Sequence, residues 1–252
     1  RNIPVRTPLG REMRRFFTAK DGYLLVDADY SQIELRVLAH ISGDEIMKKA
    51  FLEGVDIHTV TASQVFNQPI EWVTPDLRSK AKAVNFGIVY GIGAFSLSKD
   101  IGVSVPKASE YIRSYLSKYS GIAHYMEQTV AKAKRDGYVE TMFGRRRYIK
   151  ELAAKNKNLQ AFGERVAKNT PIQGTAADII KIAMIKVYNR LEKSGLDARL
   201  ILQVHDELIV EAKEDCAEKV ALLLKEEMEN AVKLTVPMTV DVNIGKTWYD
   251  TH

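Results

Sequence analysis

Two cations and two aromatic rings recur every fourth residue in the stretch RSKAKAVNFGIVYG, which covers positions 78–91. In a helix these four side chains would share one face, because residues four positions apart lie one above the other; they are Arg78, Lys82, Phe86 and Tyr90. The cations come first, where unpaired backbone N–H groups already favour phosphate. The rings follow, where a base or a sugar could pack. The same spacing is also typical of a solvated basic face beside core aromatic residues, and both interpretations stand at this point.

Carboxylates stand at the ends of two apolar segments. Asp29 lies at the end of the stretch YLLVDADY, and Asp206 lies between two strand-like segments near the other end of the chain, with Glu207 beside it. If strands from both ends share one sheet, these acids can converge. Aspartate oxygens are hard ligands that suit Mg²⁺ or Mn²⁺ rather than zinc. Taken singly, Asp206 is equally a turn residue and Asp29 a strand terminator.

Alternating apolar residues at the two ends of the chain predict the strands that would carry these acids. A hairpin with strands at 16–19 and 23–30 is expected around the Asp-Gly turn, which is a strong hairpin signal. A second hairpin, with strands at 199–204 and 207–211, places Asp206 at its tip. A last strand is expected in MTVDVNIG, near the end of the chain.

Between these strands the apolar period is helical. Helices are expected from residue 32 to the break at Gly43 and then over 44–53, 56–66, a segment that starts near Pro75, 106–118, 122–135, 174–194 and 214–233. A short hairpin with Gly144 at its tip is expected in YVETMFGRRRYI. Strands at both ends and helices in the middle predict a discontinuous α+β domain with a helical insertion.

The composition favours a soluble intracellular protein that can meet a phosphate-bearing partner. The 252 residues are 46% apolar, which is ample for a core, and the formal net charge is +5. The single cysteine, Cys216, excludes an internal disulfide and a Cys-rich zinc site. No apolar run approaches the roughly 20 residues of a membrane span, and no secretory leader opens the chain.

Three strings resemble, in the same order, the signature motifs of family A DNA polymerases, the bacterial DNA polymerase I type. They are DYSQIELR from Asp29, RSKAKAVNFGIVYG from Arg78 and VHDE from Val204. The connecting strings NIPVRT, DIHT, GYVETMFGRRR and NTPIQGTAAD resemble the family as well, so the resemblance covers essentially the whole chain. It implies an α+β fold in which an antiparallel-sheet palm is built from both chain ends and mostly helical fingers are inserted.

The resemblance implies a two-metal nucleotidyl transfer from a dNTP to a primer 3′-hydroxyl. Asp29 and Asp206 would hold two Mg²⁺ ions, for which Mn²⁺ can substitute. The backbone carbonyl of Tyr30 would be a further ligand, and Glu207 a supporting carboxylate. Lys82 would donate a proton to the departing pyrophosphate.

The same resemblance implies a set of nucleotide contacts. They are Gln32, Glu34, His58, Arg78, Lys82, Phe86 and Tyr90. Arg78 and Lys82 would grip the triphosphate, Phe86 would pack against sugar and base, and Tyr90 would stack at the template end. Glu34 stands at the family position under the sugar, where it would exclude the 2′-hydroxyl that distinguishes ribonucleotides.

Contacts to primer and template are implied for a third set of residues. They are Asn2, Arg6, Arg145, Arg146, Arg147, Arg165, Asn169, Gln173 and His205. Contacts of this kind act largely through the DNA backbone, which suits an enzyme that must accept every sequence. Three adjacent arginines at a hairpin tip are equally typical of a solvated turn.

The implied domains are a palm at 1–40 and 165–252 and fingers at 41–164. The family continues upstream with a thumb that clasps the duplex and an exonuclease-type domain, so we expect a fragment whose primer-template affinity is weak. Arg1 stands where the family has Gln, and Ser79 where some members have a second Arg. The first departure casts doubt on one minor primer-template contact, and at the second only Arg78 is carried over from the family.

Two alternatives stay open beside a DNA polymerase. One is a single-subunit RNA polymerase, whose motifs are related, although Glu34 and the complete DYSQIELR string disfavour it. The other is a catalytically inert core that binds nucleic acid. The expected partners are primed DNA and dNTPs, with no membrane, and the expected state is a monomer in the cytoplasm, associated with the nucleoid.

Overall fold

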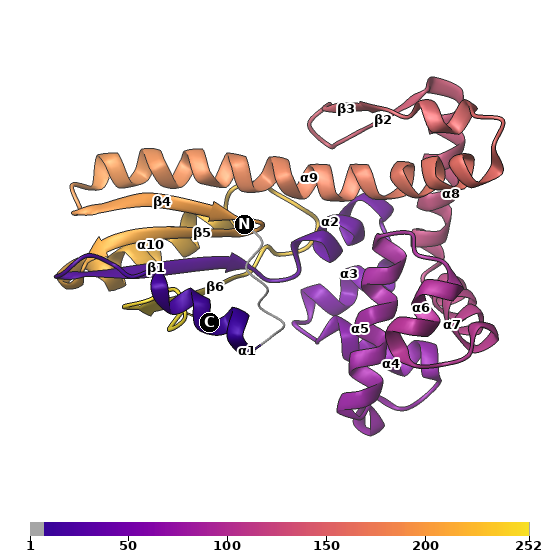
Figure 1. The fold of residues 1–252 in the computed structure, drawn as a ribbon, viewed down its shortest axis with the longest axis horizontal. Coiled ribbons are helices and arrows are strands. Elements are labelled where there is room, and N and C mark those ends of the chain that lie inside the picture. The colour runs from indigo at the N-terminus through magenta and orange to yellow at the C-terminus, as the bar shows by residue number, and fades with distance from the viewer. Residues whose placement is uncertain (1–7, 252) are drawn as a thin grey trace. The chain divides into compact units, whose positions relative to one another are not determined.

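The computed structural model describes residues 8–251, which form two compact units (Figure 1). Unit 1 takes in the stretch that ends at Ile33, the stretch Ala176–Lys233 and the chain from Met238 onward. Unit 2 consists of Glu34–Thr175 and the short stretch Leu234–Pro237. The mixture of helices and antiparallel strands confirms the predicted α+β class.

Unit 1 is built on a four-stranded antiparallel sheet in the order β4-β5-β1-β6. The strands are β1 (Tyr23–Tyr30), β4 (Ala198–Val204), β5 (Glu207–Lys213) and β6 (Val240–Gly245). In Figure 1 the indigo β1, from the start of the chain, lies between strands from its end. The prediction that both chain ends share one sheet is therefore confirmed.

Apolar burial on β1 and β5 forms the core of unit 1. Val26, Ala28, Leu208 and Val210 are fully buried, as expected for adjacent central strands. Helix α10 (Ala217–Glu229) packs against β1 and β6. The Tyr30 hydroxyl donates to the backbone carbonyl at Met228 over 2.6 Å, which ties the last turn of the helix to the end of β1.

Unit 2 is almost entirely helical. Its elements are α2 (Ile33–Ser42, which begins at the boundary), α3 (Glu45–Leu52), α4 (Ile57–Phe66), η2 (Ile70–Trp72), α5 (Pro75–Val89), α6 (Ala94–Ile101), α7 (Val105–Lys118), α8 (Ser120–Asp136), the hairpin β2 (Tyr138–Glu140) and β3 (Arg146–Tyr148), η3 (Lys150–Ala153) and the first half of α9 (Lys157–Ser194). The second half of α9 belongs to unit 1.

Local capping explains why several of these helices begin where they do. The side chains of Asp44, Asp56, Thr74 and Ser104 each accept a hydrogen bond from the backbone N–H three residues later, at the start of α3, α4, α5 and α7 respectively. Such N-caps satisfy a donor that would otherwise lack a partner. Pro75 occupies the first turn of α5, as predicted, because its fixed φ suits that position.

The predicted hairpin over 16–30 is wrong in its first half. The chain forms a short 3₁₀ helix, η1 (Met13–Phe16), after α1 (Pro8–Glu12), and only an isolated bridge joins Thr18 to Thr247. The backbone of 17–19 instead exchanges hydrogen bonds with 246–248, so the C-terminal segment replaces β1 as its partner. The Asp-Gly turn itself is present.

Helix boundaries differ from the prediction at three places. Helix α9 begins at Lys157 rather than Gly174 and continues through Pro171, where a break would be expected from the sequence. Helix α6 was not predicted, and α10 ends at Glu229, after the 3₁₀ turn η4 (Glu214–Cys216).

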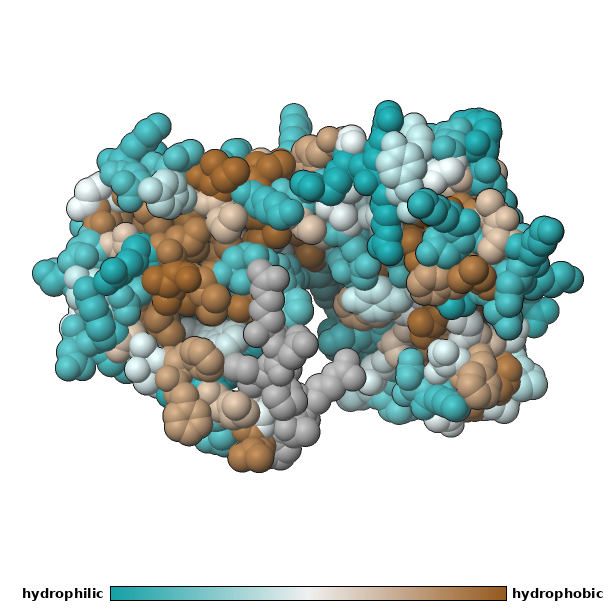
Figure 2. Space-filling view, turned by 45° about the horizontal axis from the view of Figure 1, so that its top comes forward, coloured by the Kyte–Doolittle hydropathy of each residue, from teal (hydrophilic) through white to brown (hydrophobic). Residues whose placement is uncertain are grey.

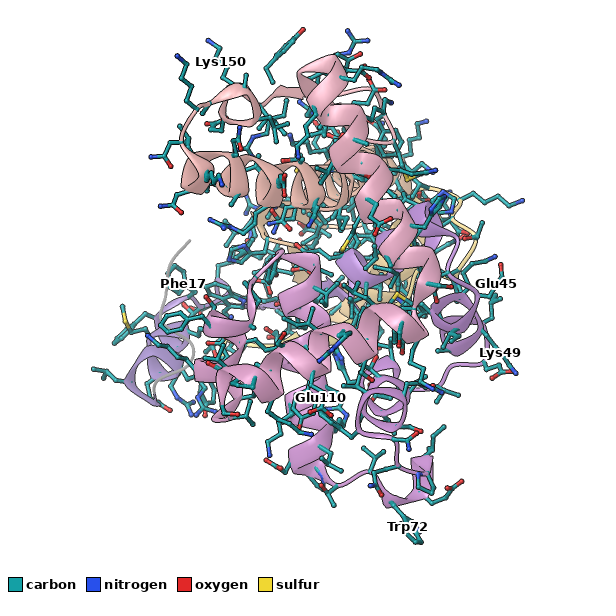
Figure 3. All side chains as sticks on the ribbon, turned by 90° about the vertical axis from the view of Figure 1, so that its right-hand side faces the viewer. Phe17, Glu45, Lys49, Trp72, Glu110 and Lys150 are labelled. Carbon is teal, nitrogen blue, oxygen red and sulfur yellow. The ribbon has the colours of Figure 1, made fainter. Side chains whose placement is uncertain are left out.

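The surface carries both charged and apolar side chains. Leu9 and Phe16 in the N-terminal segment are mostly exposed, and Figure 2 shows brown apolar groups interspersed with teal hydrophilic ones. Trp72, on η2, points away from the helices of unit 2 (Figure 3). None of the helices in residues 8–251 combines the length and the apolar character needed to cross a bilayer.

Candidate functional site

The sheet of unit 1 brings the predicted acids together. The β1–β5 register places Asp29 opposite Glu207, and the backbone N–H of Tyr30 donates to the carbonyl of Asp206 over 3.3 Å. On its other side, Asp29 lies opposite Asp241 of β6. Residues that are far apart in the sequence are therefore neighbours, and Asp29, Tyr30, Asp206 and Glu207 meet at one end of the central strand pair.

Electrostatics at the β4–β5 turn favour a cation. Burial, above all, raises the pKa of Asp206, and the charge of Glu207 raises it further, although a backbone hydrogen bond and the neighbouring His205 lower it. His205 has a φ of 50°, in the left-handed region that non-glycine residues rarely adopt. Its carbonyl accepts from the Gln203 side-chain amide over 2.7 Å, which holds the turn.

The oxygen donors at this turn fit Mg²⁺, which does not need all of its ligands from the protein. Within the part of the chain that the structure describes, no group of three or more His, Cys, Asp or Glu side chains is arranged to hold a metal. Mg²⁺ commonly takes one or two carboxylates and completes its shell with water and substrate phosphate. Asp27 lies on the same face of β1 as Asp29. It is buried and accepts a hydrogen bond from the Thr251 hydroxyl over 3.3 Å, so we assign it a structural role.

Helix α5 in unit 2 carries the predicted stripe of cations and rings. Arg78 and Lys82 are exposed, Phe86 is half-buried, and Tyr90 is the C-cap residue. The Phe86 and Tyr90 rings are stacked, with centroids 6.0 Å apart and an angle of 19° between their planes. A Cβ on Gly87 would lie 2.8 Å from the Ile92 side chain, so any larger residue there would require Ile92, in the loop that packs back on the helix, to shift.

The two cations of the stripe differ in their partners. Arg78 donates to both carboxylate oxygens of Asp56, over 2.7 and 3.1 Å. Burial raises the pKa of Asp56, but hydrogen bonds from Arg78 and Thr59 outweigh it and bring the value to about 2. Lys82, in contrast, makes no hydrogen bond or ion pair with any other described residue. Its ammonium group is the cation that a ligand can reach without breaking an internal contact.

His58 lies beside this stripe. It is buried, and its ring centroid is 5.8 Å from that of Phe86. Burial lowers the pKa of His58 to about 4, with Arg78 and Lys82 lowering it and Asp56 opposing them. The imidazole is therefore neutral near pH 7.

The first half of α9 runs past the end of α5. The Asn169 side-chain amide donates to the carbonyl of Tyr90 over 3.0 Å, and a Cβ on Gly91 would lie 3.4 Å from the Arg165 side chain. Arg165, Asn169 and Gln173 follow a four-residue spacing, which places them on one face of the helix. The structure thus gathers His58, the α5 stripe and these predicted DNA contacts within unit 2.

The predicted arginine hairpin is confirmed as a hairpin, with Gly144 at a φ of 77° near its tip. Arg145, Arg146 and Arg147 are all exposed. Arg146 donates to Glu140 over 3.4 Å and lies 4.6 Å from the centroid of the Tyr138 ring, while Arg147 donates to Thr170 over 3.4 Å. These contacts fix the orientation of two arginines without covering them.

Other predicted residues fall at the boundary of the units or outside the described residues. Gln32 lies in the turn between β1 and α2 with a φ of 57°, and Glu34 lies half-buried in the first turn of α2. Asn2 and Arg6 lie outside residues 8–251.

Three residues near the predicted sites were missed by the sequence analysis. Asp56 binds Arg78, Asn85 binds His58, and Asp241 faces Asp29. The N-cap pattern at Asp56 and the alternating strand pattern around Asp241 were available as signals. Asn85 gave none, because its side chain acts inside the core.

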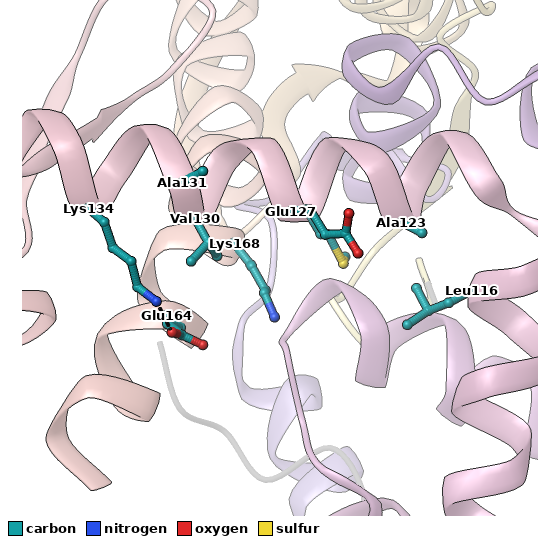
Figure 4. Close-up of a pocket in the computed structure, with 9 residues that line it drawn as sticks. Leu116, Ala123, Glu127, Val130, Ala131, Lys134, Glu164 and Lys168 are labelled. Carbon is teal, nitrogen blue, oxygen red and sulfur yellow. Dashed lines mark hydrogen bonds and ion pairs between the residues drawn. The ribbon is translucent and has the colours of Figure 1, made fainter. Parts of the chain in front are cut away.

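A separate pocket of about 500 Å³ lies between α7, α8 and α9 in unit 2 (Figure 4). Leu116, Met126 and Val130 are among the residues that line it. Lys134 and Glu164 also line it and form an ion pair. None of the predicted site residues lines it. The pocket therefore gives no support to the site that the motifs predict.

Comparisons with known proteins agree with the motif resemblance. The family model described as DNA polymerase family A matches residues 1–250. DNA polymerase I of Caldicellulosiruptor bescii is 51% identical over 250 residues, which are 99% of this chain and 29% of that protein. The thermostable DNA polymerase I of Thermus aquaticus is 51% identical over 247 residues, which are 98% of this chain and 29% of that protein.

A solved structure gives the same result for the fold. The POL domain of Pol1 from M. smegmatis, in complex with DNA primer-template and dNTP, superposes with a TM-score of 0.94 at 43% identity. The match covers 99% of this chain and 44% of that one. The chain thus spans 29% of the length of the two DNA polymerase I relatives named above.

Asp206→Asn is expected to raise the Tm of the chain in the absence of divalent cations. Because the folded-state pKa of Asp206 is raised, its ionised form costs stability at pH values above the ordinary pKa, and the neutral amide removes this cost. We expect a rise in Tm at pH 7 and a smaller rise as the pH approaches 4, where the Asp206 carboxylate of the unmodified chain is increasingly protonated. Differential scanning calorimetry measures it.

The control is Asp215→Asn, which neutralises an exposed carboxylate that pairs with Lys213 over 3.3 Å. This variant should show no rise. A lower Tm for Asp206→Asn than for the unmodified chain would contradict the electrostatic account of the turn.

Proposed function

The chain belongs to DNA polymerase family A, and from that membership we propose that it transfers nucleotides from dNTPs to the 3′-hydroxyl of a DNA primer, as directed by a template. The observation that carries the proposal is the pairing of β1 with β5, which makes neighbours of Asp29 and Asp206. The POL domain from M. smegmatis, which has the same fold, was solved with primer-template and dNTP. Such an activity serves DNA replication and repair.

Asp29, Asp206 and the carbonyl of Tyr30 are the oxygens that we propose to bind two Mg²⁺ ions, with Mn²⁺ as a substitute. When bound, such ions lower the pKa of the attacking hydroxyl and offset the charge on the leaving pyrophosphate. Glu207 adds negative charge beside Asp206 and so strengthens the attraction for cations. Burial, with a smaller contribution from Glu207, raises the pKa of Asp206, and a bound cation would favour the ionised form.

The α5 face is proposed to bind the incoming dNTP. Lys82 would bind the triphosphate and donate a proton to pyrophosphate, since its ammonium group makes no hydrogen bond or ion pair with another described residue. Arg78 would exchange or share its carboxylate partner, Asp56, with phosphate oxygens, which it can also bind in a bidentate way. The stacked rings of Phe86 and Tyr90 would pack against the sugar and base.

Two further nucleotide contacts are proposed, one in the turn before α2 and one in the first turn of that helix. Gln32 would contact the incoming nucleotide, and Glu34 would lie under its sugar. Because a carboxylate at that position leaves no room for a 2′-hydroxyl, the proposed substrate is a deoxynucleotide.

Primer and template are proposed to lie along the basic residues of α9 and the β2–β3 hairpin. These are Arg145, Arg146, Arg147, Arg165, Asn169 and Gln173, with His205, Asn2 and Arg6 as further contacts. Exposed arginines attract phosphates of any sequence. We propose a palm at 1–40 and 165–252, fingers at 41–164, a monomeric state, and a bacterial cytoplasm as the location, among nucleoid DNA. A protein of these 252 residues alone would bind DNA weakly, because a thumb would not contribute.

Primer extension tests the proposed function. With a primed DNA template, Mg²⁺ and dNTPs at high protein concentration, we expect extension that follows the template sequence. Asp206→Asn should reduce its rate by about 100-fold or more, since the loss of a metal ligand removes several kcal/mol of transition-state stabilisation. Extension with NTPs alone would indicate an RNA polymerase, and duplex binding without any extension would indicate an inert core.

Glu34→Ala is expected to admit ribonucleotides. Removing the carboxylate opens the space that we propose for the 2′-hydroxyl, so the preference for dNTP over NTP should fall by about tenfold or more, which is about 1.4 kcal/mol. Single-nucleotide extension with matched dNTP and NTP measures the ratio of kcat/KM values. Glu45→Ala, at the corresponding first-turn position of α3, is the control and should leave the ratio unchanged. An unchanged ratio in Glu34→Ala would remove this role.

A further inference from the structure

A chain of four hydrogen-bonding side chains runs through the core of unit 2 behind the α5 face. Asn85 contacts His58 Nδ1 through its amide nitrogen over 3.0 Å, and its oxygen accepts from the Thr61 hydroxyl over 3.1 Å. The Thr61 and Tyr119 hydroxyls are 2.9 Å apart. All four residues are buried, with exposed fractions of 2% or less. The two hydroxyl protons in this hydrogen-bond chain therefore need acceptors within the protein.

The hydrogen bonds along these four side chains can be donated in either of two directions. Each direction gives a different tautomer of His58. In one, Tyr119 donates to Thr61, Thr61 to the Asn85 oxygen, and the Asn85 amide to His58 Nδ1. Nδ1 is then an acceptor, and the imidazole proton resides on Nε2. In the other direction the Asn85 amide is flipped, His58 donates from Nδ1, and Nε2 is a bare lone pair.

Tyr119, at the buried end of this hydrogen-bond chain, decides between the two directions of proton donation. In the second arrangement Thr61 donates to Tyr119, so the Tyr119 proton has no acceptor, because Thr61 is its one hydrogen-bond partner among the described residues. An unsatisfied buried donor is costly, because it loses its hydrogen bond to water and gains none in the protein. Ionisation does not relieve this cost, since burial raises the pKa of the Tyr119 hydroxyl to about 12. The first direction leaves no hydroxyl proton of this hydrogen-bond chain unpaired.

We infer that Asn85, oriented by Thr61 and Tyr119, is a positioning residue that holds His58 as the tautomer with its proton on Nε2. His58 thereby presents an N–H donor on the ring edge that faces away from Asn85, beside the cations of α5. The inference rests on the proposed function for the identity of its ligand, which is the triphosphate of a dNTP. A bare nitrogen in the same place would repel phosphate oxygens, whereas an N–H binds them.

The charges around His58 explain why a neutral donor suits this place. Asp56, Arg78 and Lys82 are the charged groups that act on the ring, and burial together with the two cations keeps it neutral, with a pKa of about 4. A third positive charge beside Arg78 and Lys82 would cost repulsion in the ligand-free state. The fixed tautomer gives phosphate a directed contact without that cost, and one that does not change between pH 6 and 8.

NMR of the chain with ¹⁵N-labelled histidine tests the inference directly, because the two ring nitrogens report which of them carries the proton. We expect the Nε2–H form of His58 in the unmodified chain and in Thr61→Ser, which keeps the hydroxyl. Thr61→Val has nearly the same shape but cannot donate to Asn85, so it should give a mixture of tautomers. The Nδ1–H form in the unmodified chain would overturn the inference, and this result needs no variant to fold.

Single-turnover primer extension with enzyme in excess gives the functional consequence. In Thr61→Val the dNTP concentration for half-maximal rate should rise about 3–10-fold relative to Thr61→Ser, with little change in the maximal rate, as expected for the weakening of one hydrogen bond. The same value in both variants, together with the same tautomer, would contradict the inference. If the unmodified chain extended no primer, the proposed function would fail while the tautomer result still decided the role of Asn85.

Discussion

The pairing of β1 with β5 and β6 is the constraint on which the proposed chemistry depends. Asp29 and Asp206 lie on parts of the chain that are far apart in sequence, and antiparallel backbone hydrogen bonds make them neighbours. A shift of one residue in this register would turn Asp29 to the opposite face of the sheet. Burial of Val26 and Ala28 on one strand and Leu208 on the other makes such a shift costly. The apolar core of unit 1 therefore sets the position of its acids.

In unit 2, contacts with neighbouring side chains hold Arg78 and His58, on and beside the basic face of α5, in fixed orientations. Arg78 is oriented by Asp56, which also caps α4, so one carboxylate couples the start of that helix to the middle of the proposed triphosphate site. A buried hydrogen bond joins the Asn85 side chain to His58 Nδ1. Lys82 makes no hydrogen bond or ion pair with another described residue. Charged and polar groups held in place before the ligand arrives need little reorganisation when it binds.

Much of this arrangement could be predicted from the sequence, because it depends on local patterns. The four-residue spacing of the α5 stripe, the Asp206 turn and the alternating strands all appear in the structure. The failures concern partners that local patterns do not identify. The segment 16–19 pairs with the C-terminal segment rather than with β1, α9 continues through Pro171, and Asp56 meets Arg78 across 22 positions. The direction of the Asn85 amide depends on Tyr119, which no motif connects to it.

Mn²⁺ binding tests most directly whether β1 and β5 build one metal site. The binding is measured from the decrease in the EPR signal of the free ion. The comparison needs Asp29→Asn, Asp206→Asn, the double variant and, as a control, Asp215→Asn. If the acids act together, each single substitution should weaken Mn²⁺ binding by about tenfold or more, and the double variant should lose no more than either single one. Binding that is unchanged in both single variants would contradict the account.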